Sequence, residues 1–211
     1  MARFFYRDGI KPIKVNIVRL ILTLTSMLVL AYAVSASSEI VTTGPYNVSF
    51  AMNMTQKYGV QSVTPSVESF RTSYSMLITT NNTTWALVKI IEYKNYTDAT
   101  PDLWSTIDLR GLEKRGLKNI TYQPNMLIDN ESAFGFTGLN SQNNRLYFAS
   151  YWLDSKGCDC GPVYIGKTNV DIESTYPLNT TAELMSNLHV EKIALAVKLK
   201  PKPLTFAPTK Q

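Results

Sequence analysis

Two cysteines separated by one residue, Cys158 and Cys160, are the side chains of this sequence best suited to redox or metal chemistry. They fall in a turn predicted between two strands, and such a turn can bring alternate Cα atoms within the roughly 4.4–6.8 Å that a disulfide needs. A strained and easily reduced disulfide is therefore one prediction. Free or intermolecular thiols are a second. A metal site is the third, although His189 is the only other soft ligand, so a two-fold dimer would have to complete the tetrahedral shell.

The residues that follow match a phosphate-binding motif in spacing but not in chemistry. Gly161, Gly166, Lys167 and Thr168 fit the pattern G-x-x-x-x-G-K-T. Such a loop needs small residues, so that backbone N–H groups can surround a phosphate, and a helix directly after it. Residues 162–165 instead favour extended structure, and the residues after Thr168 alternate as in a strand. We interpret the match as chance and predict no nucleotide and no other cofactor.

No catalytic group is recognisable from residue spacing. His189 is the only histidine, so any serine or cysteine triad would have to include it. It follows a predicted helix, where a cation suits the negative end of the helix dipole, and capping is the simpler interpretation. The carboxylates form no identifiable acid–base pair. We therefore predict a protein without catalytic residues.

The N-terminal segment has the layout of an export signal. Basic residues precede an apolar stretch that starts at Leu20 and ends in Val34-Ser35-Ala36, which predicts cleavage after Ala36. An uncleaved anchor is the alternative, because residues 17–36 are long enough to cross a bilayer as a helix. In both cases the later residues are extracytoplasmic, either secreted or attached to the cell membrane by this segment.

The basic balance of the chain belongs mainly to this leader. The whole sequence has 21 basic and 16 acidic residues, and leaving out the five basic and one acidic residue of 1–36 gives 16 and 15. Nucleic-acid binding needs basic residues clustered on the folded domain, so we predict no nucleic-acid partner.

Eight Asn-x-Ser/Thr sequences without an intervening proline agree with export. They begin at Asn47, Asn53, Asn81, Asn82, Asn95, Asn119, Asn130 and Asn179. Oligosaccharide transfer takes place across the membrane on an exposed acceptor, so we predict a glycoprotein. Simple abundance of Asn and Thr in polar turns is the alternative explanation. With the leader, these sites favour an archaeal or eukaryotic cell surface over a bacterial periplasm.

Alternating apolar and polar residues predict several strands. They are expected at 46–53, 70–78, 85–93, around 120–122, and at 131–137, 145–154 and 163–172. The strands 85–93 and 145–154 are apolar on both faces, which predicts a central place in the sheet. Between 70–78 and 85–93, Asn81 and Asn82 suit a hairpin turn because Asn tolerates positive φ.

Two amphipathic helices are also expected. The first covers residues 101–115, with Thr100 as its cap, Pro101 in its first turn and Gly111 tolerated inside it because of close packing. Thr180 and Glu183 fit a capping box at the start of a second, short helix. Residues 194–211 are expected to begin with an edge strand, or alternatively with a continuation of the helix, and to end in a loose, basic, proline-containing tail.

These elements predict one extracytoplasmic α+β domain over residues 37–193, after a signal or anchor helix in residues 1–36. It would contain an antiparallel sheet of about six or seven strands with two main helices packed against it. The opening strand YNVSF, the strand WALVKIIEY and the closing helix NTTAELMSNLHVEK resemble the PsbP/Mog1-like α/β sandwich family over residues 44–193. The chain lacks the lipid-accepting cysteine of the lipoprotein members. The resemblance implies binding or assembly without catalysis.

The first functional prediction is thus an exported, N-glycosylated cell-surface or secreted protein that binds an unidentified protein partner or envelope glycan. The alternative is an extracytoplasmic redox or metal-handling protein that uses Cys158 and Cys160. A hydrolase is the third possibility.

Overall fold

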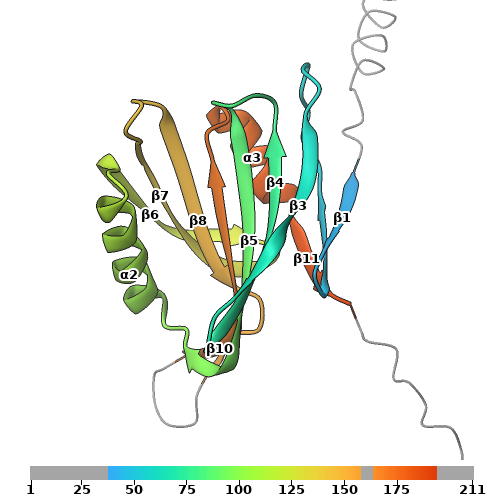
Figure 1. The fold of residues 1–211 in the computed structure, drawn as a ribbon. Helices are drawn as coiled ribbons and strands as arrows, with labels where there is room; N and C mark the ends of the chain where they lie inside the picture. The colour runs from blue at the N-terminus through green and yellow to red at the C-terminus, as the bar shows by residue number, and fades with distance from the viewer. Residues whose placement is uncertain (1–37, 158–163, 194–211) are drawn as a thin grey trace, which may run out of the picture. The chain divides into compact units, whose positions relative to one another are not determined.

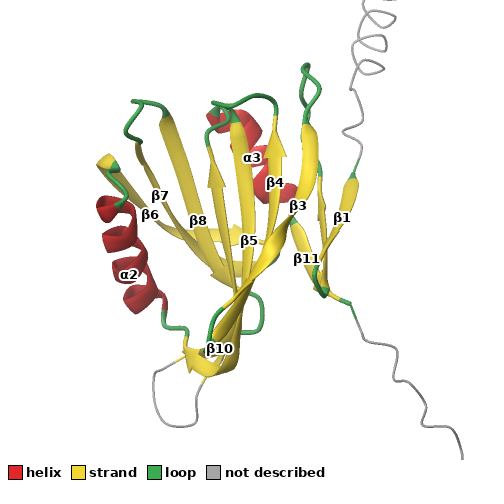
Figure 2. Cartoon of the chain, in the orientation of Figure 1, coloured by secondary structure: helices red, strands yellow, loops and turns green. Residues whose placement is uncertain are grey.

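The computed structural model of the chain describes residues 38–157 and 164–193. The predicted leader with its cleavage site at Ala36, the segment that holds Cys158, Cys160 and Gly161, and the tail at 194–211 lie outside the described residues. The described part contains antiparallel sheets and two helices, which confirms the α+β class (Figures 1 and 2). Neither of these helices is long and apolar enough to cross a membrane.

The main sheet has eight strands, more than the six or seven predicted. They are β3 (Gly59–Val67), β4 (Arg71–Thr79), β5 (Trp85–Asp98), β6 (Lys118–Ile128), β7 (Glu131–Leu139), β8 (Arg145–Trp152), β9 (Lys156–Gly157) and β10 (Tyr164–Ser174). Their order is β3-β4-β5-β10-β8-β7-β6, and β9 pairs with β10. Strands β5 and β8 each have neighbours on both sides, as their apolar sequences predicted.

A second sheet of three strands, which was not predicted, covers part of one face. It consists of β1 (Glu39–Thr43), β2 (Tyr46–Phe50) and β11 (His189–Lys192), in the order β1-β2-β11. Val48 of β2 lies opposite Val190 of β11, and both are buried. Their side chains belong to the same apolar core as Val88 of β5, so the small sheet packs on the main one.

The helices α2 (Pro101–Lys114) and α3 (Leu178–Asn187) lie on opposite faces of the main sheet. Along β8, Phe148 packs in one cluster with Leu112 of α2, whereas Ala149 packs in another with Leu184 of α3. Successive residues of a strand point to opposite faces. One face is therefore covered by α2, and the other by α3 together with the small sheet (Figure 1).

The start of α2 agrees with the sequence in position but not in capping. Thr100 occupies the N-cap position, yet its side chain makes no capping hydrogen bond. The carboxylate of Asp98 instead accepts the Thr100 N–H at 2.8 Å. Nothing lies within 4 Å of a Cβ built on Gly111, so the expected close packing at this glycine was wrong.

The predicted capping box at α3 was also wrong. This helix begins at Leu178, so Thr180 lies inside its first turn rather than at the cap. The Glu183 carboxylate accepts the backbone N–H of Asn53 at 2.9 Å and connects α3 to the end of β2. The sequence pattern thus located the helix correctly, but Glu183 makes a tertiary contact and does not cap the helix.

The hairpin between β4 and β5 is present, but its asparagines act through a side chain. Neither Asn81 nor Asn82 has a positive φ. The Asn81 side-chain oxygen instead accepts the N–H groups of Thr83 and Thr84 at 2.9 and 2.8 Å. An Asn side chain that replaces a backbone acceptor is a second way to build a turn.

Candidate functional site

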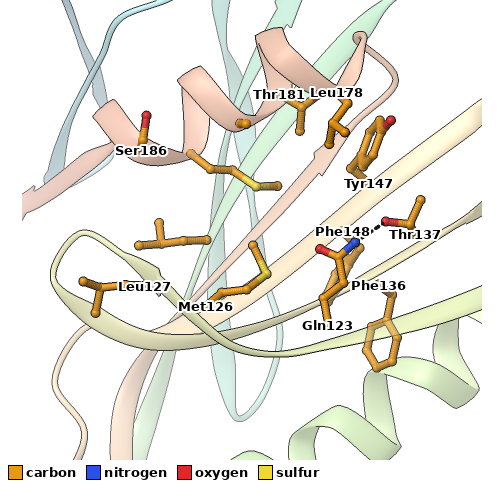
Figure 3. Close-up of a pocket in the computed structure, with 13 residues that line it drawn as sticks. Gln123, Met126, Leu127, Phe136, Thr137, Tyr147, Phe148, Leu178, Thr181 and Ser186 are labelled. Carbon is orange, nitrogen blue, oxygen red and sulfur yellow. Dashed lines mark hydrogen bonds between the residues drawn. The ribbon is translucent and has the colours of Figure 1, made fainter.

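A groove runs between α3 and the β6–β7 edge of the main sheet, and Figure 3 shows its apolar half. It consists of two pockets of about 300 and 350 Å³. Four residues line both pockets: Gln123, Thr137, Tyr147 and Leu178. Pockets of about 300 Å³ and more are of the size that small organic ligands occupy. We call the two pockets together the α3 groove.

The α3 groove exists partly because β7 carries small side chains on the face toward α3. A Cβ on Gly135 would lie 2.7 Å from the sulfur of Met126 and 2.7 Å from the carbonyl oxygen of Phe148. Only glycine at this position therefore lets the Met126 side chain lie across β7 without displacing a neighbour. Ala133, two residues earlier on the same face, is also small.

The edge strand β6 is irregular where it borders the groove. The β6–β7 register shifts between Gln123 and Met126. The residues in between are Pro124, which cannot donate to the ladder, and Asn125, which has a φ of 58°. Bulges of this kind bend an edge strand and re-aim its side chains. The irregularity thus separates the polar side chain of Gln123 from the apolar ones that follow it.

One half of the groove is apolar. Its lining includes Met126, Leu127 and Leu178, which are labelled in Figure 3, and Met185. Leu127 and Leu178 are 69% and 60% exposed, so the apolar half has an exposed apolar rim. Methionine adapts to ligands of varied shape because its side chain is unbranched and flexible.

The other half of the groove also has apolar lining residues, including Leu139, but we call it the polar half because it holds the one charged side chain among the described lining residues. It is lined by Asn119, Thr121 and Arg145, and Arg145 carries the only charge among the described residues that line either pocket. Between the halves, the Gln123 side-chain amide donates to the Thr137 hydroxyl at 3.0 Å (Figure 3). The groove therefore presents an apolar surface at one end and hydrogen-bond donors with a cation at the other.

His189 does not cap a helix, which corrects the interpretation from sequence. Helix α3 ends at Asn187, and His189 is the first residue of β11. Its Nδ1 lies 2.6 Å from one carboxylate oxygen of Asp129, and the other oxygen accepts the Val190 N–H at 2.9 Å and the Tyr151 hydroxyl proton at 3.4 Å. These bonds connect the β6–β7 turn to β11 beside the groove residue Ile128.

The histidine and this aspartate form a pair rather than an assembled serine triad. Ser49 lies opposite His189 in the β2–β11 pairing. No hydrogen bond joins these two side chains in the part of the chain that the structure describes. Since 62% of the His189 side chain is exposed, whereas only 6% of the Asp129 side chain is, the carboxylate is the structural member of the pair.

A second polar group lies between α2 and the main sheet. Asp108 of α2 and Asp171 of β10 each have one carboxyl oxygen that is fully buried and has no hydrogen-bond partner. Burial, together with the charge of Asp171, raises the pKa of Asp108 to about 8. Burial also raises the pKa of Asp171 to about 6, although a hydrogen bond from Ser150 and the charge of Lys89 oppose this.

Arg115, whose positive charge acts on both aspartates, is also bound to Glu173. Arg115 lowers the pKa of both carboxyls, but its guanidinium bonds to Glu173 at 2.7 and 2.9 Å. Glu173 in turn raises both pKa values. Within the described ranges, no group of three or more His, Cys, Asp or Glu side chains is arranged to hold a metal ion. The aspartates are therefore a feature of the α2 packing and not part of the α3 groove.

The described residues of the phosphate-loop pattern lie in strand β10. Gly166 is buried, and a Cβ at this position would lie 2.4 Å from the ring of Trp152. The N–H groups of Lys167 and Thr168 both donate to one carboxylate oxygen of Asp154, at 2.9 and 2.8 Å. Asp154 thus accepts the two backbone N–H groups that a phosphate would need, and Gly166 is required for packing against Trp152. Absence of nucleotide binding stays a prediction.

The predicted glycosylation sites are all at or near the surface. Asn47 is half-buried, and the other seven asparagines are exposed. The side chain of Asn47 accepts a hydrogen bond from the Thr42 hydroxyl at 2.9 Å, in the centre of the small sheet. The positions are therefore compatible with modification, whereas occupancy itself stays a prediction.

No family model, curated protein or solved structure matches this chain. The resemblance to the PsbP/Mog1-like sandwich consequently remains a prediction from the order of elements. The sequence did not reveal the α3 groove, because its lining combines the consecutive strands β6, β7 and β8 with α3, which follows them only after β9 and β10.

Proposed function

We propose that this chain is an exported, N-glycosylated, non-catalytic binding protein whose α3 groove holds a small amphipathic anion. The ligand would have one flexible apolar chain and one carboxylate. The observation that carries the proposal is the division of the groove into an apolar half beside Met126 and Met185 and a polar half with Arg145 as its only charge.

The apolar half would provide most of the affinity. Each methylene group removed from water contributes about 0.8 kcal/mol, so two further methylenes strengthen binding by up to about fifteenfold until the groove is full. Leu127 and Leu178, which are exposed without a ligand, would gain apolar contact at the same time.

The polar half would orient the ligand. The guanidinium of Arg145 can donate two parallel N–H bonds to a carboxylate, a geometry that an ammonium group does not offer. The neighbouring side chains of Asn119 and Thr121 supply further polar groups. Exposure of Arg145 limits its contribution to about 1 kcal/mol, or roughly fivefold in affinity.

Export is supported by a separate observation. Seven of the eight Asn-x-Ser/Thr asparagines are exposed in the folded chain, as an oligosaccharide acceptor requires. The leader predicted in residues 1–36 gives the same compartment. These two features do not depend on the ligand.

The test is a calorimetric titration of the purified exported protein with hexanoate, octanoate and decanoate, and with decanol and decyltrimethylammonium as charge controls. Ala182→Trp places a large ring in the lining of the apolar pocket from an exposed position on α3. Arg145→Gln removes the charge. Arg110→Gln, an exposed arginine on α2 at the opposite face, is the matched control.

We expect affinity to rise with chain length and decanoate to bind more tightly than decanol. Ala182→Trp should abolish binding, Arg145→Gln should lower decanoate affinity about fivefold and leave decanol unchanged, and Arg110→Gln should change neither. Equal binding of the anionic and cationic ligands, or an unchanged affinity in Ala182→Trp, would show that the groove is not the site.

A further inference from the structure

An aromatic recess lies at the end of β5 that leads to α2. Its volume is about 390 Å³, and four of its eight lining residues are aromatic: Phe70, Tyr93, Tyr96 and Trp104. The ring of Tyr93 is central, with centroids 6.5 Å from Phe70, 6.1 Å from Trp104 and 5.7 Å from Trp152. We call this recess the aromatic pocket.

Two of these rings are not needed for the core. Phe70 and Tyr96 are each 53% exposed, whereas Tyr93 is buried. An exposed ring beside a recess presents an apolar face that favours contact with C–H groups of a ligand. The aromatic pocket therefore has a buried base and an exposed rim. Each rim ring also has a cation over it: Arg71 lies 5.1 Å from the Phe70 centroid and Lys156 lies 4.7 Å from the Tyr96 centroid.

The asparagine of a glycosylation sequence lines the same pocket. Asn95, Tyr96 and Thr97 form an Asn-x-Thr sequence, and all three residues line the aromatic pocket. Asn95 itself is exposed. The other polar lining residues are Ser69 and Lys94, so no carboxylate competes for space there.

The backbone presents Asn95 outward. In the pairing of β10 with β5, Gly166 is opposite Thr97 and Thr168 is opposite Glu92, so the single residue Lys167 is opposite residues 93–96. The extra residues must bulge from the strand. A bulged, exposed acceptor is more accessible to a modifying enzyme than one within a regular ladder.

We propose that Asn95 carries an N-linked glycan whose first sugar packs against the exposed rings of the aromatic pocket. The proposal rests on the export stated under the proposed function. The sugar comes from a lipid-diphosphate-linked oligosaccharide. A bond forms between the side-chain nitrogen of Asn95 and C1 of the sugar as the bond from C1 to the diphosphate oxygen breaks. The lipid diphosphate leaves with the electron pair, and the amide loses one proton.

The apolar C–H face of a pyranose ring is complementary to an aromatic ring. A sugar joined to Asn95 would lie beside Phe70 and Tyr96 without any loss of translational freedom, because it is already covalently attached. The expected consequence is that the glycan at Asn95 stabilises the fold, whereas a glycan without an exposed ring nearby has no such effect.

Asn53 provides the matched comparison. It is exposed, and the recess that it lines contains one aromatic residue, Tyr176, which is only 1% exposed. Thr97→Ala and Thr55→Ala remove the two acceptor sequences by the same substitution. Phe70→Ser removes an exposed ring of the aromatic pocket and leaves the Asn95 sequence intact.

The experiment is to express the full chain in a glycosylating secretory host, map sugar on all eight asparagines by peptide mass spectrometry, and trim the glycans enzymatically to the first sugar. We expect Asn95 to be occupied. In the chain that keeps Phe70, loss of this sugar through Thr97→Ala should lower the melting temperature by about 3 °C. The same loss should have less than half that effect in the Phe70→Ser background, and Thr55→Ala should cause no comparable decrease.

The outcomes separate this inference from the proposed function. Sugar on other asparagines with none on Asn95 would refute the inference and leave export intact. Sugar on none of the eight would refute both. If Asn95 is occupied but the Thr97→Ala effect is the same with and without Phe70, the packing of the sugar on the ring is refuted.

Discussion

Replacement of Asp108 by Asn should make the protein more stable at alkaline pH. Asp108 of α2 has a buried carboxyl oxygen without a hydrogen-bond partner and is close enough to Asp171 for the two charges to repel. Its pKa is raised from 3.8 to about 8, so the folded state holds a proton that the unfolded state has released. Stability from this proton is complete below about pH 4 and is lost as the pH rises toward 8.

The magnitude follows from the shift. Four pKa units correspond to a ceiling of about 5–6 kcal/mol at 1.36 kcal/mol per unit. Asp108 is only half-buried, and the charges of Lys89 and Arg115 are nearby, so water and relaxation reduce this to about 2 kcal/mol. Asn is neutral at every pH and close in shape. The variant should therefore gain about 2 kcal/mol over the wild type at pH 9, or about 4–8 °C, and differ little at pH 3, where the carboxyl is protonated in both the folded and the unfolded state.

The assay is urea unfolding at pH 3 and pH 9, with the free energy of unfolding compared between wild type and Asp108→Asn. Asp102→Asn is the control, because Asp102 is exposed in the first turn of the same helix. It should lower stability by about 0.5 kcal/mol at pH 9 through the helix dipole, and it should not raise stability there. If wild type and Asp108→Asn lose the same stability between pH 3 and pH 9, the buried carboxyl is not the cause and the reasoning is wrong.

Two glycines should respond in opposite ways to alanine. Gly166→Ala should destabilise the fold by about 1–3 kcal/mol in urea unfolding, because the new Cβ would lie 2.4 Å from the Trp152 ring. An unchanged unfolding midpoint would contradict the packing role of Gly166. Gly111→Ala should stabilise the fold by about 0.5–1 kcal/mol in the same measurement, since Gly111 lies inside α2 with nothing within 4 Å of the added Cβ. A decrease in stability would mean that the space around Gly111 is not open.

The parts of the fold that sequence predicted are those with a strong local signal. Strands β5 and β8 have long apolar runs, and both are central in the sheet. Helix α2 has Pro101 at its start and a Gly116 in the left-handed region just after its end, and it was predicted to within one residue. In these segments the local pattern and the tertiary environment favour the same structure.

The parts that sequence missed depend on other segments of the chain. Strand β3, GVQSVTPSV, is polar and almost fully exposed, so it has no buried face to create an alternating pattern. It is a strand because it pairs with β4 at the sheet edge. His189 likewise looked like a helix cap because its partner, Asp129, is 60 residues earlier in the chain.

The candidate site was hidden for the same reason, although one local signal was present. Ala133, Gly135 and Thr137 alternate along β7 and leave the face toward α3 with little side-chain volume, whereas Phe134 and Phe136 fill the opposite face. A strand with large residues on one face and small ones on the other indicates a close approach or a recess on the small side. The sequence alone does not distinguish these, because the answer depends on where α3 lies.

The position of α3 explains why the recess stays open. The helix has ten residues, of which Thr181, Leu184 and Met185 are buried. The core is complete beneath Leu184, but toward the β6 edge the lining side chains Leu127 and Leu178 remain exposed. Replacement of either by a polar residue would cost the free protein little burial. Under the proposed function, the same replacement should weaken the binding of an apolar chain.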